Sequence, residues 1–463
     1  MMVPRPDVLY IEKNMWNIAD DYCRRTGAIR TMKQKLNKVE WSWALYDVAF
    51  SAFAILSTAF LPILMKLAGK PDGLSNALTT AHWGYLQSFS TLALALLAPV
   101  LGAIADFKGK KRQMFIFFFV VALCSLGAML LTNNYTILLL VNFLCAIGYS
   151  GTNIVYDAYL VDVTTNEKMN LLSSMGFAVG YAGRCLPYLV GIVLYGTLPF
   201  GITAITAIKI SIGITLVWWL VFTIPFLRNV RQLYGREDRP AHLVSQSFGS
   251  IWATLKKIVR EKNMGFFLLA YFFYIDGVNT MISMTSDFGY DVGISVTTMA
   301  LALLVTQIIA APSVLLFERI ARRVTTKNVL LIAIGVFTAI CTYALFLKSA
   351  WQFWVMAIAT GLVLGTIQAL SRSYFGRMIP DKNRNNEYFG FFNVLARYSA
   401  ILGPLMLSLF TLLTGSSRYG VASIDVLFAV GFILLLRFVP NIDTASKGKT
   451  TGVQAAPVPT EAE

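Results

Sequence analysis

A few polar and ionisable side chains interrupt the long apolar runs of this 463-residue chain, and these are the positions that could do chemistry. A charged group surrounded by hydrocarbon costs about 2.5–3.5 kcal/mol on insertion scales, so each one marks a candidate ion or substrate pathway. By the helical rise, Asp47 lies about 9 Å into its run, with Ser51 one turn further along, and Asp276 lies about 18 Å into another run. Because a buried carboxylate can exchange a proton, we predict Asp47 and Asp276 as proton sites.

Other polar residues inside apolar runs complete the predicted substrate and ion pathway. Asn153 and Asp157 are one helical turn apart, and Gln368 and Arg372 occupy the matching region of a later run. Because Asp157 and Arg372 lie near the ends of their runs, a purely structural role in helix packing explains each of them equally well. The predicted pathway residues are Asp47, Ser51, Asn153, Asp157, Arg184, Asp276, Asn279, Gln368, Arg372, Asn393 and Arg397.

Arg184 follows three glycines, Gly176, Gly180 and Gly183, along one face of its predicted helix. Close helix packing explains the glycines, but it does not explain an arginine in their line. A guanidinium keeps its proton in the membrane, so it needs a carboxylate, carbonyls, water or an anionic ligand. Asp276, at a similar depth, is the expected protein partner. A substrate carboxylate or phosphate is the alternative, and it would leave Asp276 free to take a proton.

A loop with the pattern GxxxDxxGxKK follows the second apolar run and is a predicted gating motif. Its members are Gly102, Asp106, Gly109, Lys110 and Lys111. The glycines permit a tight turn beside a neighbouring helix, and the aspartate can cap a helix or pair with a base. Lys110 and Lys111 are expected to face anionic lipid. A segment displaced by 216 residues keeps the apolar and basic framework but carries Glu318, Arg322 and Thr325 in place of Gly, Asp and Gly.

The elements that must position these residues are twelve apolar runs, each long enough to cross about 30 Å of hydrocarbon. Hydrophobic residues make up 56% of the chain and charged residues only 14%, against roughly a quarter in soluble proteins. The predicted spans are 41–65, 82–104, 113–131, 135–160, 171–195, 202–227, 264–287, 296–318, 328–348, 351–373, 388–414 and 420–439. The fold class is therefore all-α integral membrane, with two pseudo-symmetric six-helix bundles.

The basic residues predict the orientation. Of 39 lysines and arginines, 32 fall in the segments on one side of the spans and four on the other, so we expect both termini in the cytoplasm. The expected organisation comprises a cytoplasmic segment with an amphipathic helix (1–40), the first bundle (41–227), a linker with a second amphipathic helix (228–263), the second bundle (264–439) and a disordered tail (440–463).

Several stretches together resemble one branch of a transporter superfamily. The loop at 102–111 is similar to the signature loop between helices 2 and 3 of the major facilitator superfamily. The motifs that narrow the branch lie at 40–53, 173–183, 274–280, 368–375, 390–393 and 403–404. They resemble the vacuole-effluxer branch, which includes a fungal amino-acid effluxer and bacterial relatives. The resemblance implies the major facilitator fold, alternating access, and a central cavity lined by helices 1, 4, 7 and 10.

The favoured function is a secondary transporter of a small polar solute, amino-acid-like, zwitterionic or anionic, with protons as a candidate coupling ion. An exporter of amphiphiles or lipids and a non-transporting receptor or scaffold are the alternatives. No HExxH, P-loop or serine-elbow motif is present, so we predict no enzyme activity, cofactor, metal or nucleic-acid partner. We expect a monomer in a bacterial plasma membrane, with a vacuolar-type membrane as the alternative.

Overall fold

The structure, a computed structural model, describes residues 35–237, 261–291, 296–399, 402–414 and 417–443, with positions 256, 258, 260 and 294. Helices begin where the sequence supplies caps. The Asn37 side chain accepts from the backbone N–H of Glu40, and the Glu40 carboxylate accepts in return from that of Asn37, which is a capping box. The predicted amphipathic helices of 1–40 and 228–263 lie outside the described residues. Of the predicted disordered tail (440–463), the structure describes residues 440–443.

The first bundle contains the first six predicted spans. Its helices are α2 (Lys38–Ala59), α3 (Leu61–Gly69), α4 (Asn76–Ala105), α5 (Lys110–Leu131), α6 (Tyr135–Val163), α7 (Met169–Thr197) and α8 (Ala204–Asn229), with a short 3₁₀ turn η1 (Pro199–Gly201). α2 and α3 together fill the first predicted span, and the proline at the start of α3 accounts for the break between them.

The second bundle repeats this arrangement. It comprises α10 (Lys262–Asp291), α11 (Val296–Arg323), α12 (Thr326–Ala344), α13 (Ala350–Met378), η2 (Lys382–Arg384), α14 (Asn385–Tyr398), α15 (Leu402–Thr414), α16 (Ser417–Ser423) and α17 (Asp425–Phe438). The eleventh predicted span is therefore divided between α14 and α15, and the twelfth between α16 and α17.

The predicted all-helical membrane fold is confirmed. Ten helices of the described part of the chain are long and apolar enough to cross a membrane. The two remaining predicted spans are α4, whose side chains are only partly described, and the α14–α15 pair, of which each helix is too short alone.

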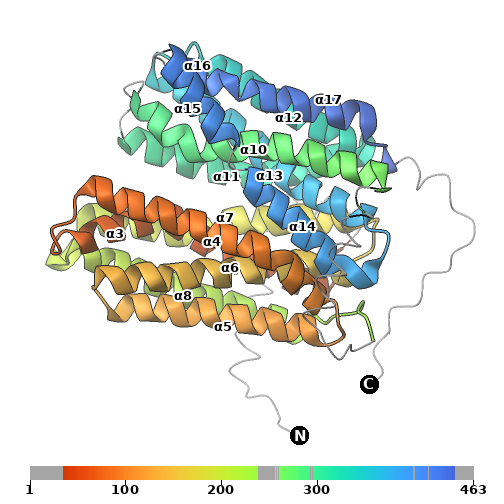
Figure 1. Cartoon of the computed structure of the whole chain (residues 1–463), viewed down its shortest axis with the longest axis horizontal. Coiled ribbons are helices and arrows are strands. Elements are labelled where there is room, and N and C mark those ends of the chain that lie inside the picture. Colours follow the sequence, from red (N-terminus) through yellow and green to blue (C-terminus); the bar gives the residue numbers. More distant parts are fainter. Residues whose placement is uncertain are drawn as a thin grey trace, which may run out of the picture.

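The two bundles meet mainly through three helix pairs. α7 packs against α11 and α13, and α4 packs against α14. In Figure 1 the first bundle occupies the lower half and the second the upper half, with α14 running toward α4 at right. We call the end of the molecule where the start of α14 meets α4 the basic end. It carries the loops at 106–109, 164–168, 324–325 and 379–384, and it is the end expected to face the cytoplasm.

Candidate functional site: a charged cavity between the bundles

A cavity of about 330 Å³ lies between the two bundles, with walls from α2, α6 and α7 of the first and α10, α13 and α14 of the second. Nine of the eleven predicted pathway residues line it: Asp47, Ser51, Asn153, Asp157, Arg184, Asn279, Gln368, Arg372 and Asn393. Helices 5 and 11 (α7 and α14) thus contribute to the wall in addition to the four helices expected.

Arg372 on α13 joins the second bundle to two carboxylates of the first. Its Nη1 donates to Asp157 Oδ1 at 3.1 Å, and its Nη2 donates to Asp47 Oδ2 at 3.4 Å. Its Nε donates to the Ser173 hydroxyl at 2.9 Å, and Nη2 also reaches the Ser173 carbonyl at 3.2 Å. Arg372, Asp47 and Asp157 are all buried. We call these three residues, one cation and two carboxylates, the charge triad.

Further contacts hold both carboxylates of the triad. The Tyr156 hydroxyl donates to Asp47 Oδ2 at 2.7 Å, and Asn393 Nδ2 donates to Asp157 Oδ2 at 3.1 Å. The guanidinium also faces the Trp43 and Phe177 rings, with 4.8 and 4.4 Å between its carbon and the ring centroids. The sequence predicted the three charged residues and Asn393 individually, but not Tyr156, Trp43 or Phe177, because aromatic residues are ordinary in apolar helices.

The glycines of α7 let that helix approach α2 beside the triad. A Cβ atom at Gly176 would lie 2.5 Å from Asp47 Oδ2, and one at Gly180 would lie 2.9 Å from the Ser51 hydroxyl. A Cβ at Gly183 would lie 2.5 Å from the Val48 side chain. Larger residues at these positions would push the two helices apart, so the glycines serve close packing at the cavity wall.

Arg184 lies in the cavity wall, and its guanidinium stacks 4.1 Å from the Tyr181 ring centroid. The Tyr181 hydroxyl donates to Gln368 Oε1 at 2.7 Å, which fixes the ring across the bundle interface. Arg184 Nε is buried, and no hydrogen-bond partner lies among the described residues. The expected pair with Asp276 is wrong, since no ion pair joins these two described residues. Equal depth along two helices does not imply that their side chains face each other.

Asp276 is buried away from the cavity wall. Both of its oxygens lie 3.0 Å from the backbone nitrogen of Gly403, and Thr280 donates to Oδ1 at 3.3 Å. The division of the eleventh span leaves the first N–H groups of α15 without helical partners, and Asp276 satisfies one of them. A Cβ at Gly403 would lie 1.9 Å from the Thr280 hydroxyl, so glycine is required there.

Two further predicted residues have different outcomes. Asn279 lines the cavity and donates to the Ala396 carbonyl at 3.2 Å. The side chain of Arg397 lies outside the described residues.

At the basic end, Asp106 connects the first bundle to the start of α14. It accepts from the backbone N–H of Asn386 at 2.9 Å, from the Asn386 amide at 2.7 Å and from the Glu387 N–H at 3.0 Å. A Cβ at Gly102 would lie 2.6 Å from the Asn386 carbonyl, and Gly109 has a φ of 77°. Burial raises the pKa of Asp106 to about 7, although Lys111 and the Asn386 and Glu387 donors lower it, so this carboxyl titrates near neutral pH.

Lys111 does not face lipid, contrary to the expectation. It is fully buried and donates to Asp162 Oδ2 at 2.5 Å and to Asn385 Oδ1 at 2.9 Å. A buried ammonium requires a carboxylate, and Asp162 at the end of α6 supplies it. Lys110 is partly exposed and donates to Gln113 at 3.1 Å. The motif therefore holds the bundles together at the basic end.

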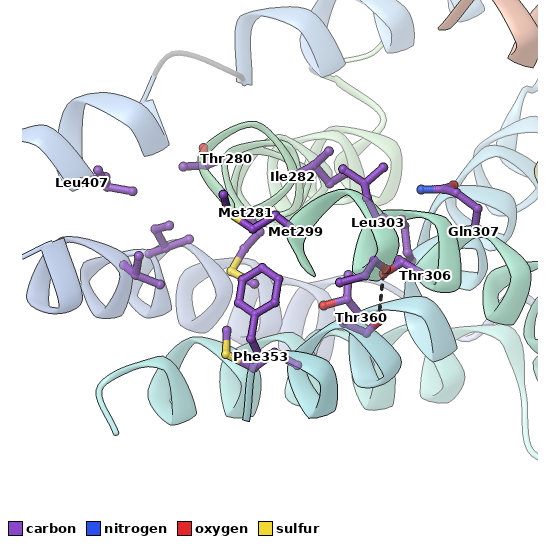
Figure 2. Close-up of a pocket in the computed structure, with 16 residues that line it drawn as sticks. Thr280, Met281, Ile282, Met299, Leu303, Thr306, Gln307, Phe353, Thr360 and Leu407 are labelled. Carbon is purple, nitrogen blue, oxygen red and sulfur yellow. Dashed lines mark hydrogen bonds between the residues drawn. The ribbon is translucent and has the colours of Figure 1, made fainter. Parts of the chain in front are cut away.

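A second hollow of about 90 Å³ lies inside the second bundle, away from the triad (Figure 2). Methionines and aromatic or aliphatic side chains dominate its lining, including Met281, Met299 and Phe353, with threonines between them. None of the described residues that line it is charged, so these residues offer nothing to neutralise a charged solute. Among the described residues, no cluster of His, Cys, Asp or Glu could hold a metal ion.

Two six-helix bundles with a charged cavity between them define a transporter of the major facilitator type. A family model described as "Vacuole effluxer Atg22 like" matches residues 73–170 and 161–447. The chain therefore belongs to the Atg22-like vacuole-effluxer family of the major facilitator superfamily, and it is a multi-pass membrane transporter.

Individual relatives agree with this assignment. The chain is 40% identical over 418 residues to an uncharacterized MFS-type transporter, YxiO, of Bacillus subtilis, covering 89% of this chain and 96% of the relative. It is 24% identical to autophagy-related protein 22 of Kluyveromyces lactis, covering 72% and 73% of the two chains. The crystal structure of the transporter FucP in its outward conformation shares the fold, with a TM-score of 0.64 at 13% identity over 86% of this chain and 99% of that one.

Proposed function

We propose that this protein is a secondary transporter of a small anionic or zwitterionic solute, such as an amino acid. The observation that carries the proposal is Arg184, a cation in the cavity wall whose buried Nε lacks a partner among the described residues. An unpaired buried donor is costly, and a ligand carboxylate would satisfy it. Asn153 and Asn279 on neighbouring walls add amide groups that could orient such a ligand.

The triad suits the other end of a zwitterion. Its two carboxylates and one guanidinium leave one negative charge uncompensated, which an ammonium group or a proton would neutralise. The cavity volume of about 330 Å³ lies at the small end of the range for ligand pockets, about 300–1,000 Å³, consistent with a small metabolite. The family description, a vacuole effluxer, supports transport as the function.

We further propose alternating access with proton coupling at Asp47 and Asp157. Both carboxylates lie in the first bundle and their cation in the second, so protonation of either would weaken a bond that holds the bundles together. Asp276, the other predicted proton site, serves instead as the cap of α15. The basic end is closed here, so the opposite end would admit solute in this state.

The proposed setting is a bacterial plasma membrane, with a monomeric transporter and both termini in the cytoplasm. The Bacillus relative supports the membrane, and the basic loops support the orientation.

Uptake by purified protein in liposomes tests the proposal. A panel of amino acids and small carboxylates would be offered to liposomes with and without the protein, in the presence and absence of a pH gradient. Accumulation of at least one anionic or zwitterionic solute above the empty-liposome level is expected. A protein that moves none of them, yet is folded and inserted, would favour the receptor or scaffold alternative.

An exporter of amphiphiles is the second candidate, and the apolar hollow of Figure 2 favours it. Its methionine-rich lining would accept a flexible apolar group. Preference for lipid-like solutes over amino acids in the same liposomes would select this function.

A further inference from the structure

The segment after the sixth span reaches the lysine–aspartate pair of the first bundle. Asp162, which binds Lys111 through Oδ2, also accepts through Oδ1 from the backbone N–H groups of Leu233 at 3.0 Å and Tyr234 at 2.9 Å. These residues follow the end of α8 by four and five positions. The same pair binds Asn385 at the start of α14, so it connects the two bundles.

The Lys111–Asp162 pair has a counterpart in the second bundle, here called the node, in which different residues supply the charges. Lys327, which follows Lys111 by 216 residues, donates to the carbonyls of Leu436 at 2.8 Å and Val439 at 2.7 Å at the end of α17. The cation of this node is Arg377 at the end of α13, and its carboxylate is Asp443. Asp443 follows the end of α17 by five residues, just as Tyr234 follows the end of α8.

Asp443 organises the contacts that reach the first bundle. Its Oδ2 accepts from the backbone N–H of Thr326 at 2.5 Å, at the start of α12. The Thr326 hydroxyl accepts from Arg377 Nη2 at 2.9 Å and from Asn170 Nδ2 at 2.7 Å. Asn170 belongs to the start of α7 and also accepts from Ser373 at 2.6 Å. The hydrogen bonds that begin at Asp443 therefore extend through Thr326 to Asn170 of the first bundle.

The loop between α11 and α12 has no carboxylate available for this node. Glu318 is paired one turn away with Arg322, Nε to Oε1 at 2.5 Å, within α11 itself. The carboxylate of this node, Asp443, is thus supplied from outside the repeat. Burial would raise the pKa of Asp443, but Arg377 and the Thr326 N–H outweigh it and lower that pKa, so the carboxylate is ionised at neutral pH.

We propose that Val439–Asp443, here called the tail strap, locks the basic end closed, with Asp443 as the carboxylate that the second repeat lacks. The Tyr374 hydroxyl bonds the Pro440 carbonyl and fixes the strap against α13. Release of Asp443 would free Thr326 and Arg377 together and separate α7 from α12. The strap makes the C-terminal segment part of the gate.

A distance measurement tests the strap without any substrate, so its result is independent of the proposed solute. Spin labels would be placed at exposed positions on either side of the node, Asn166→Cys and Arg323→Cys, in a full-length chain without other cysteines. Asp443→Asn removes the ion pair and should shift the ratio of long to short inter-label distances by about tenfold. Asp425→Asn is the matched control, since its carboxylate accepts from Thr342 at the opposite end of α17.

Two more variants complete the test. Thr326→Val removes the hydroxyl that joins Arg377 to Asn170 and leaves the strap intact, so it should lengthen the same distance even if Asp443→Asn does not accumulate. Asp443→Glu keeps a carboxylate that can accept from the Thr326 N–H and pair with Arg377, so it should retain the short distance. An Asp443→Asn distance distribution that matches those of wild type and Asp425→Asn would overturn the proposal.

Discussion

Arg372 depends on partners from three helices at once. Removing a charged pair from water is costly, and the pair is tolerated only when its remaining hydrogen-bonding positions are filled. Ser173, Tyr156 and Asn393 fill them here. A residual negative charge remains on Asp47 and Asp157. The triad therefore combines a structural contact between the bundles with a group that can be titrated.

We predict that Asp157→Asn abolishes solute accumulation driven by a pH gradient but preserves the exchange of labelled for unlabelled solute. Asparagine can still accept from Arg372, whereas it cannot carry a proton across the cycle. Uptake and counterflow in the same liposomes would measure both activities, with Asp425→Asn as the control. Undiminished gradient-driven accumulation by Asp157→Asn, with Asp47→Asn also active, would remove the triad as the coupling site.

Among the helices, α2 and α7 pack closely through the glycines of α7. We predict that Gly176→Ala destabilises the protein by about 1–3 kcal/mol, because the added methyl group overpacks the carboxylate of Asp47. Gly213→Ala in α8 is the matched control, since nothing lies within 4 Å of its Cβ position and alanine favours a helix. Thermal unfolding in detergent measures both. Equal melting temperatures for the two variants would contradict the packing account.

The two loops of the repeat differ in backbone conformation as well as in sequence. Gly109 adopts φ 77° and ψ −10°, whereas Thr325 in the second loop has φ 155° and ψ 154°. Threonine in that region costs roughly 1–3 kcal/mol. The glycine lost from the second loop is therefore accompanied by a different backbone conformation.

For the whole molecule, the apolar runs predicted twelve spans, and the scarce polar and charged residues within them predicted nine of the 18 residues that line the cavity. Both follow from the cost of placing polar groups in lipid, which acts on each residue separately. The partners could not be predicted in the same way. Asp47 meets Arg372, and Arg184 misses Asp276, because helix rotation is set by packing between bundles. The role of Asp443 was hidden for the same reason, in a tail whose composition indicates disorder.

The proposed orientation, with the basic end in the cytoplasm, can be tested by labelling introduced cysteines. Cysteines introduced at Asp72 and Ala350, which are exposed at the end opposite the basic end, should react with an impermeant reagent added outside intact cells. A cysteine at Glu237, exposed at the basic end, should react only after the cells are opened. Labelling of Glu237→Cys from outside would reverse the orientation proposed here.

Arg184 is proposed to bind the negative group of a small solute in the cavity. Ligand-induced thermal stabilisation of purified protein tests it most directly, because a ligand at 100 times its Kd stabilises by about 2.7 kcal/mol. We predict that an anionic or zwitterionic solute raises the melting temperature of wild type, not of Arg184→Ala, and only weakly that of Arg184→Lys, which lacks the planar fork. A folded Arg184→Ala protein stabilised as much as wild type would contradict the claim.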